Sequence, residues 1–440
     1  MKRILQRLFP VLCLLVATGV SAASALAMAQ AKDPVAIATH LLDELDAGRF
    51  DAAESGFTET MRTAVPAAKL KAGWEALPAQ AGPAQGRGVA VAQPQGLMTL
   101  VVVPLHYARM EVVAKIAIDA SGQIAGFLIQ PAPPPSAPVP ADAAFTEREV
   151  AIGDATATLP GTLALPRGAG PFPAVVLVHG SGPHDRDETI GPNRPFLDLA
   201  RGLAAQGIAV LRYEKRTRAR PGDYTATPLT IDSETTQDAV AAVALLRTIR
   251  EIDGKRIYVL GHSQGAMMAP RIAARAQAAG LILLAAPSRP LLDILVEQNR
   301  RLAAMDGSVS PEESAFIDTL VQQAARIRAG EDVPPQDTPM GLPAAYWRDL
   351  DSVDAVAEAK PLHQPMLFLQ GGRDIQVVDA DWQRWQDAFG RDERATFRRY
   401  PALNHLAIAG EGPGSLAEYQ TPGHVDTGLI GDVARWVLSR

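Results

Sequence analysis

The chain has 440 residues, of which 47% are hydrophobic and 20% charged. This balance is ordinary for a globular protein and excludes wholesale disorder. The formal net charge of −6 argues against a nucleic-acid partner, because nonspecific binding to phosphates needs a basic face. The single cysteine, Cys13, excludes an intramolecular disulfide and any metal site built from several thiolates.

Residues 1–29 have the order of charge and hydropathy that is typical of a secretory signal peptide. Three cations precede an apolar run over residues 8–20, and four overlapping Ala-x-Ala sites follow it. A run of 13 residues is shorter than the roughly 20 that span a bilayer, which disfavours a retained anchor. We expect cleavage after Ala29 and export of the mature chain, periplasmic or secreted, without a stable membrane anchor. Loss of the three cations changes the net charge from −6 to −9.

Residues 32–130 are expected to form a small α+β domain. Apolar residues recur at helical spacing as far as Leu77, and a break rich in glycine and proline follows near residues 82–88. Ser121-Gly122 then supplies a hairpin turn between the last two strands. The strand-like runs cover residues 89–92, 97–103, 110–118 and 124–129.

A proline-rich stretch separates this domain from the rest of the chain. Six of the ten residues 131–140 are proline, which cannot lie inside a helix or a sheet. We therefore predict a semi-rigid linker over residues 131–144.

From residue 145 to the end, short apolar runs alternate with helical segments. Such alternation implies an α/β domain over residues 145–440, with a mostly parallel sheet and helices on both faces. About seventy helical and charged residues, 290–358, interrupt the alternation. We predict a helical cap there, over the edge of the sheet where ligands bind in α/β domains. The buried runs cover residues 175–178, 208–211, 257–260, 281–285 and 366–369.

The strongest chemical signal is Gly261-His262-Ser263-Gln264-Gly265, between an expected strand and an expected helix. A sharp turn from strand to helix needs flanking residues without side chains, and Gly261 and Gly265 meet that need. Such a turn lifts its central residue above the sheet, so Ser263 is the predicted nucleophile. A serine hydroxyl also needs a base that takes its proton.

The base and its orienting acid are expected after the nucleophile in chain order. Asp374 and His405 follow Ser263, each in a loop past the end of an expected strand. We predict His405 as the general base, held by Asp374 at its other ring nitrogen. The remaining alternatives are His424 as base and Asp379 or Asp381 as acid.

Two backbone N–H groups are expected to stabilise the negative oxygen of the tetrahedral intermediate. One belongs to Gln264, the residue after the nucleophile, and the other to Ser181 in the glycine-rich loop 179–182. The charged stretches 184–188 and 212–216 are interpreted as ion-pair networks. No metal site and no cofactor are expected.

On these motifs, residues 145–440 resemble the α/β-hydrolase superfamily, in the branch of dienelactone hydrolases and serine aminopeptidases. Residues 180–187 resemble a subgroup of exported bacterial esterase-like hydrolases. In that subgroup, an NTF2-like or cystatin-like domain of unknown function often precedes the hydrolase, and residues 32–130 are similar to it. The resemblance implies the α/β-hydrolase fold and serine esterase chemistry, but it leaves the substrate open. Dienelactone hydrolases use a cysteine where this chain has Ser263, which disfavours that activity.

We therefore expect a serine hydrolase that cleaves small-molecule carboxylic esters through Ser263, His405 and Asp374 and an acyl-enzyme. A serine peptidase or acyl-thioester hydrolase with the same triad is the first alternative. In a peptidase, a carboxylate of the cap would bind the substrate amine. A non-catalytic envelope binding protein is the second alternative, and the oligomeric state is left open. The candidate cap carboxylates are Glu297, Glu312 and Glu313.

Overall fold

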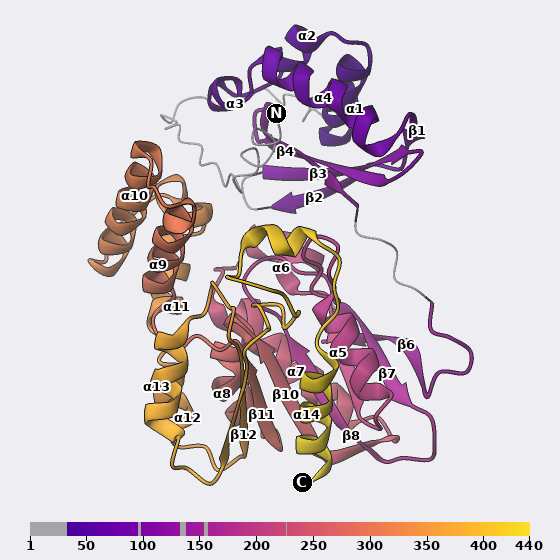
Figure 1. Ribbon diagram of the computed structural model, residues 1–440, viewed down its shortest axis with the longest axis vertical. Coiled ribbons are helices and arrows are strands. Elements are labelled where there is room, and N and C mark those ends of the chain that lie inside the picture. Colours follow the sequence, from indigo (N-terminus) through magenta and orange to yellow (C-terminus); the bar gives the residue numbers. More distant parts are fainter. Residues whose placement is uncertain (1–32, 96–97, 133–137, 154–156, 226) are drawn as a thin grey trace. The chain divides into compact units, whose positions relative to one another are not determined.

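The computed structural model describes residues 33–95, 98–132, 138–153, 157–225 and 227–440. The predicted signal peptide lies outside the described residues, as do residues 133–137 of the predicted linker. The chain divides into two compact units (Figure 1). Among the described residues, the first comprises Asp33–Ala132 and Gln322–Ala344, and the second comprises Pro138–Val321 and Ala345–Arg440.

The first unit begins with helices and continues with an antiparallel sheet, as predicted. Strands β1, β3, β4 and β5 are neighbours in that order, and β2 also pairs with β3. The helices are α1 (Pro34–Asp46), α2 (Phe50–Ser55), α3 (Glu59–Ala64) and α4 (Ala67–Ala81). The strands are β1 (Ala84–Arg87), β2 (Val91–Gln95), β3 (Met98–Tyr107), β4 (Glu111–Asp119) and β5 (Ile124–Pro131).

A separate hydrophobic core holds the helices and strands before residue 132 together. Leu41, Leu42 and Leu45 lie on one face of α1, and alternate residues of β3 are buried in the same cluster. These are the periods of 3.6 and 2 residues expected for a helix lying on a sheet. The hairpin at Ser121-Gly122 forms as predicted, with Gly122 at φ 82°.

Strand β1 corrects the sequence prediction, which placed a break at residues 82–88. Between α4 and β1 the break covers only Gly82 and Pro83, and Gly82 ends the helix at φ 85°. Residues 84–87 then pair antiparallel with β3, with a shift of register between Ala84 and Gly86. An irregular edge strand of four residues has too few side chains to show an alternating pattern.

The second unit contains an eight-stranded sheet in the order β13-β12-β11-β10-β8-β9-β7-β6. The six strands from β13 to β9 are parallel, and β7 and β6 extend the sheet antiparallel. The expected α/β-hydrolase fold is confirmed. The strands are β6 (Phe145–Ile152), β7 (Leu159–Pro166), β8 (Phe172–Val178), β9 (Ala209–Tyr213), β10 (Ile252–His262), β11 (Gly280–Leu284), β12 (Met366–Gly371) and β13 (Ala395–Tyr400).

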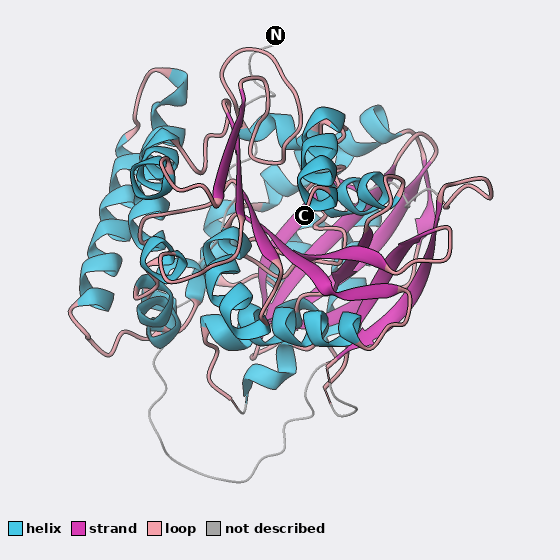
Figure 2. Ribbon diagram, turned by 90° about the horizontal axis from the view of Figure 1, so that it is seen from below, coloured by secondary structure: helices cyan, strands magenta, loops and turns pink. Residues whose placement is uncertain are grey.

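Helices lie on both sides of this sheet (Figure 2). Side chains of α5 and α14 share one core with Val175 and Leu177 of β8, whereas α7 and α8 pack together on β10, and α8 also packs on β11. The central strands β8 and β11 are buried along nearly their whole length, which requires cover on both faces of the sheet. The α-helices of the second unit outside residues 290–358 are α5 (Pro195–Ala204), α6 (Arg216–Ala219), α7 (Gln237–Arg247), α8 (Gln264–Ala276), α13 (Asp379–Phe389) and α14 (Thr427–Leu438).

Residues 290–358, the expected cap, are mainly helical. A π-helical turn, Asp232–Thr236, also precedes α7. Of the helices in the described part of the chain, none is both long and apolar enough to cross a membrane. The helices of residues 290–358 are α9 (Leu291–Ala303), α10 (Pro311–Arg328), α11 (Ala344–Asp351) and α12 (Ala355–Ala359).

Candidate active site

Ser263 lies in a strained turn between β10 and α8. Its backbone has φ 52° and ψ −120°, a region that costs about 1–3 kcal/mol for a residue with a side chain. A Cβ at Gly261 would lie 2.2 Å from the carbonyl oxygen of Gly265, and one at Gly265 would lie 2.2 Å from that of Val178. Only glycine fits at both positions, so the sequence dictates this turn. Ser263 therefore stands at the carboxyl end of a central parallel strand.

His405 and Asp374 are in direct contact. The Nδ1 atom of His405 lies 2.8 Å from Oδ2 of Asp374, and both side chains are buried. The other carboxylate oxygen accepts hydrogen bonds from the N–H groups of Gln376 and Val377. The carboxylate is thus held rigidly, and it engages Nδ1 so that Nε2 is the ring nitrogen left to exchange a proton.

The turn at Ser263 and the loop of His405 are joined by a hydrogen bond. The Nε2 atom of His262 lies 2.9 Å from the carbonyl oxygen of His405, and the centroids of the two rings are 4.7 Å apart. The N–H of Ser263 donates to the carbonyl oxygen of Leu284 at the end of β11. The structure therefore brings the three predicted residues to the same edge of the sheet.

The alternative residues have other partners. The His424 side chain is 89% exposed and pairs with Asp198. Asp381 is buried and accepts hydrogen bonds from the backbone of Ser288 and Arg289. Asp379 is an exposed ion-pair partner of Arg399. None of these three contacts His405 in the described structure.

The loop after β8 passes close to Ser263. A Cβ at Gly180 would lie 3.3 Å from the Cβ atom of Ser263. The N–H of Gly180 donates to Oε1 of Glu188 at 2.7 Å. Neither of the predicted donors, the N–H groups of Ser181 and Gln264, donates a hydrogen bond to another described residue.

A buried ion pair beside the candidate triad was missed by the sequence analysis. Nδ1 of His262 lies 2.9 Å from Oε2 of Glu188, and both side chains are at most 4% exposed. Burial alone would lower the pKa of His262, but the Glu188 carboxylate outweighs it and raises that pKa above its ordinary value. Burial would raise the pKa of Glu188, yet the charge of His262 lowers it to about 2. Each group therefore favours the charged form of the other.

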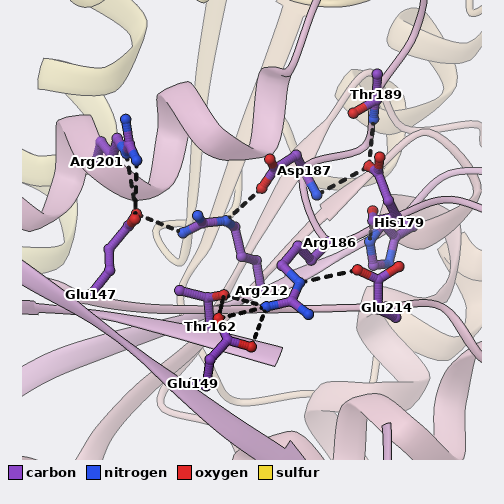
Figure 3. Close-up of polar contacts among 11 residues, drawn as sticks. Glu147, Glu149, Thr162, His179, Arg186, Asp187, Thr189, Arg201, Arg212 and Glu214 are labelled. Carbon is purple, nitrogen blue, oxygen red and sulfur yellow. Dashed lines mark hydrogen bonds and ion pairs between the residues drawn. The ribbon is translucent and has the colours of Figure 1, made fainter. Parts of the chain in front are cut away.

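The two charged stretches form ion-pair networks, as predicted (Figure 3). Arg186 contacts Glu149 and Glu214, and Arg212 lies between Glu147 and Asp187. These contacts tie the loop that carries Glu188 to strands β6 and β9. No group of three side chains suited to holding a metal ion occurs among the described residues.

The cap carboxylates that could have bound a substrate amine are occupied or exposed. Glu297 lies 2.7 Å from Arg289 and 3.1 Å from Arg301. Glu312 and Glu313 are exposed in the first turn of α10. The described residues therefore provide no buried, unpaired carboxylate at these three positions.

Comparison with known proteins identifies both parts of the chain. Residues 175–418 match the model of the "Alpha/beta hydrolase family", and residues 38–127 match that of a "Protein of unknown function (DUF3887)". The chain is 39% identical over 337 residues to "Esterase EstD" of Thermotoga maritima, covering 76% of this chain and 78% of that protein.

Solved structures with similar folds include two esterases. Est1E from Butyrivibrio proteoclasticus has 17% identity and a TM-score of 0.44, covering 66% of this chain and 99% of that one. An esterase from Pyrococcus furiosus has 16% identity and a TM-score of 0.44, covering 70% of this chain and 97% of that one.

Proposed function

Because the chain belongs to the alpha/beta hydrolase family, we propose that it is a serine hydrolase that cleaves small-molecule carboxylic esters. The observation that carries the proposal is the buried contact of 2.8 Å between His405 and Asp374. The loop of His405 is also hydrogen-bonded, through its carbonyl oxygen, to His262 in the turn of Ser263. The similarity of the chain to an esterase, at 39% identity, supports an ester as the substrate class.

The first half of the proposed reaction forms an acyl-enzyme. The Oγ atom of Ser263 attacks the ester carbonyl carbon while Nε2 of His405 takes the hydroxyl proton. The carbonyl oxygen becomes an oxyanion, which accepts hydrogen bonds from the N–H groups of Ser181 and Gln264. When the tetrahedral intermediate collapses, the bond to the alcohol oxygen breaks and His405 returns the proton to the departing alcohol.

The second half restores the enzyme with water. His405 takes a proton from a water molecule, whose oxygen attacks the acyl carbon bound to Ser263. The second tetrahedral intermediate collapses, the carboxylic acid leaves, and the proton returns to the Oγ atom of Ser263. Throughout, Asp374 holds the imidazole orientation and stabilises the imidazolium. These steps use no cofactor.

The test compares leaving groups and acyl chains. p-Nitrophenyl esters from acetyl to decanoyl are measured beside an amino-acid p-nitroanilide and an acyl thioester, with the wild type and Ser263→Ala. We expect ester turnover that falls by at least about 10⁴-fold in the variant. Faster turnover of the anilide or the thioester would favour the first alternative. A folded protein that cleaves none of the three would contradict the proposal and favour a binding protein.

We also propose that the mature protein is exported after cleavage at Ala29. The order of the leader residues supports this, together with an apolar run too short to span a bilayer. Intact mass spectrometry of the protein from the periplasmic and extracellular fractions should find a chain that begins at Gln30. A chain that keeps residues 1–29 in the membrane fraction would contradict export as a released protein.

A further inference from the structure

We propose that a buried network of Lys215, Glu234 and Tyr346 positions the two backbone N–H groups that receive the oxyanion. The inference rests on the proposed function and concerns how that site is held. Glu234 is the centre of the network, because each of its carboxylate oxygens contacts one of two separate arms.

The first arm fixes the Ser181 N–H. The Nζ atom of Lys215 lies 2.8 Å from Oε1 of Glu234 and donates to the carbonyl oxygen of Gly180 at 2.7 Å. This carbonyl and the Ser181 N–H belong to one planar peptide group, so a fixed oxygen fixes the direction of the N–H. A hydrogen bond from an ammonium also polarises the peptide group and makes its N–H a stronger donor.

The second arm holds Gln264. Oε2 of Glu234 accepts hydrogen bonds from Nε2 of Gln264 at 3.2 Å and from the hydroxyl of Tyr346 at 2.5 Å. Burial, reinforced by the charge of Glu234, raises the pKa of Tyr346 well above its ordinary value. The hydroxyl therefore stays protonated and donates. The network thus holds the side chain of the residue whose N–H begins α8.

Stability alone is a poor explanation for this network. The side chains of Lys215 and Glu234 are 2% and 5% exposed, and buried ion pairs are often no more stable than well-packed apolar residues. Glu234 also lies in the π-helical turn Asp232–Thr236, a rare conformation that is frequent at functional sites. We infer instead that the pair fixes the orientation of the peptide groups that carry the two N–H donors. An oxyanion site needs these dipoles to be oriented before the substrate arrives.

The N–H of Gly180, on the other side of the residue whose carbonyl oxygen Lys215 binds, is held as well. Glu188 accepts the N–H of Gly180 while Lys215 binds its carbonyl oxygen. Gly180 is therefore fixed on both sides by buried charged groups. Tyr346 belongs to α11, so the expected cap region contributes directly to the network. Its hydroxyl is the part of the network that can be removed with the smallest disturbance.

Two variants test the network, and a third serves as control. Tyr346→Phe removes one hydroxyl. The double variant Lys215→Met/Glu234→Gln removes both charges, so that neither remains unpaired in the interior. Lys255→Met removes a cation from an exposed position on β10 and should leave activity unchanged.

We measure kcat and KM for p-nitrophenyl butyrate, together with inhibition by 1-butaneboronic acid, which forms a tetrahedral adduct with a nucleophilic serine. For the double variant we expect kcat to fall about 10- to 100-fold, less than the ~10² to 10³ lost when a donor is removed. For Tyr346→Phe we expect a fall of about 3- to 10-fold. KM should change less than about threefold, and boronate affinity should fall in parallel with kcat. Affinity for butyramide, a planar competitor, should not change.

A purely structural role would give a different pattern. If Tyr346→Phe and the folded double variant keep wild-type boronate affinity and kcat, or raise KM alone, the network does not position the oxyanion donors. Tyr346→Phe keeps the test decisive even if the double variant fails to fold. A wild-type protein that neither cleaves the ester nor binds the boronate would instead overturn the serine-hydrolase proposal, and the network proposal with it.

Discussion

At the scale of single residues, a buried charged side chain, Glu188, lies beside the turn of Ser263. Glu188 is fully buried, has a backbone φ of 51° and contacts both His262 and the N–H of Gly180. One carboxylate thus connects the nucleophile turn to the loop that carries an expected oxyanion donor. Nothing in the sequence separates Glu188 from the other acidic residues of its charged stretch, because burial of a single side chain depends on the whole fold.

The low pKa of Glu188 predicts how the stability of the protein depends on pH. Because its pKa falls to about 2 on folding from an ordinary 4.5, Glu188 stabilises the folded state above about pH 4.5. This contribution is lost as the pH falls from there towards 2. We expect Glu188→Gln to be less stable at pH 7 by about 3 kcal/mol and to lose less further stability on acidification than the wild type.

Urea unfolding at pH 7 and pH 3 checks this expectation, with the exposed residue Glu393 substituted to Gln as the control. His262 has the opposite sign. Its raised pKa means that its stabilising contribution is present at low pH and is lost as the pH rises past that value. An identical dependence on pH in the wild type and Glu188→Gln would contradict a charged buried pair.

At the scale of elements, the strand–turn–helix of residues 252–276 has the tightest geometry in the site. The carbonyl of Val178 on β8 occupies the space that a Cβ at Gly265 would need. We expect Gly265→Ala to displace Ser263 and to lower ester turnover by at least about 100-fold, the loss typical of a misplacement of about 1 Å. Gly254→Ala, on the preceding strand β10, is the matched control.

At Gly254 a new Cβ would meet only the Arg247 side chain, at 3.8 Å. Turnover of p-nitrophenyl butyrate by the two variants, with circular dichroism to verify folding, tests whether the turn sets the position of Ser263. If Gly265→Ala retained the activity of Gly254→Ala, the turn would not set the position of the nucleophile.

The elements that the sequence predicted are those whose pattern is local. The buried parallel strands β8 to β12 are continuous apolar runs, and Gly261 and Gly265 disclose the turn between β10 and α8. Strands β6 and β7 were missed because they join the sheet antiparallel at its edge, where β6 is partly exposed. Of the site, the candidate triad was predicted from loop positions, whereas Glu188 and Glu234 were not. Their roles depend on partners far away in the chain.

At the scale of the whole molecule, the two units have separate hydrophobic cores. All residues proposed for catalysis belong to the second unit. We expect Leu42→Ala, in the core of the first unit, to destabilise that unit by about 2–5 kcal/mol and to change kcat less than about twofold. Leu203→Ala, a matched deletion in the second core, should lower the temperature at which activity is lost.

Differential scanning calorimetry and residual ester turnover after heating measure both effects. A loss of turnover in Leu42→Ala at a temperature where the second unit stays folded would show that catalysis depends on the first unit. Equal inactivation temperatures in Leu203→Ala and the wild type would contradict the role given to the second core.

The central claim is that Ser263 is the nucleophile, and covalent labelling tests it most directly. The wild-type protein and Ser263→Ala are treated with a fluorophosphonate, followed by intact mass spectrometry and peptide mapping. We predict one adduct per wild-type chain, located on Ser263, loss of ester turnover in proportion to labelling, and no adduct on the variant. An adduct elsewhere, or an unlabelled wild type whose ester turnover survives in Ser263→Ala, would contradict the account.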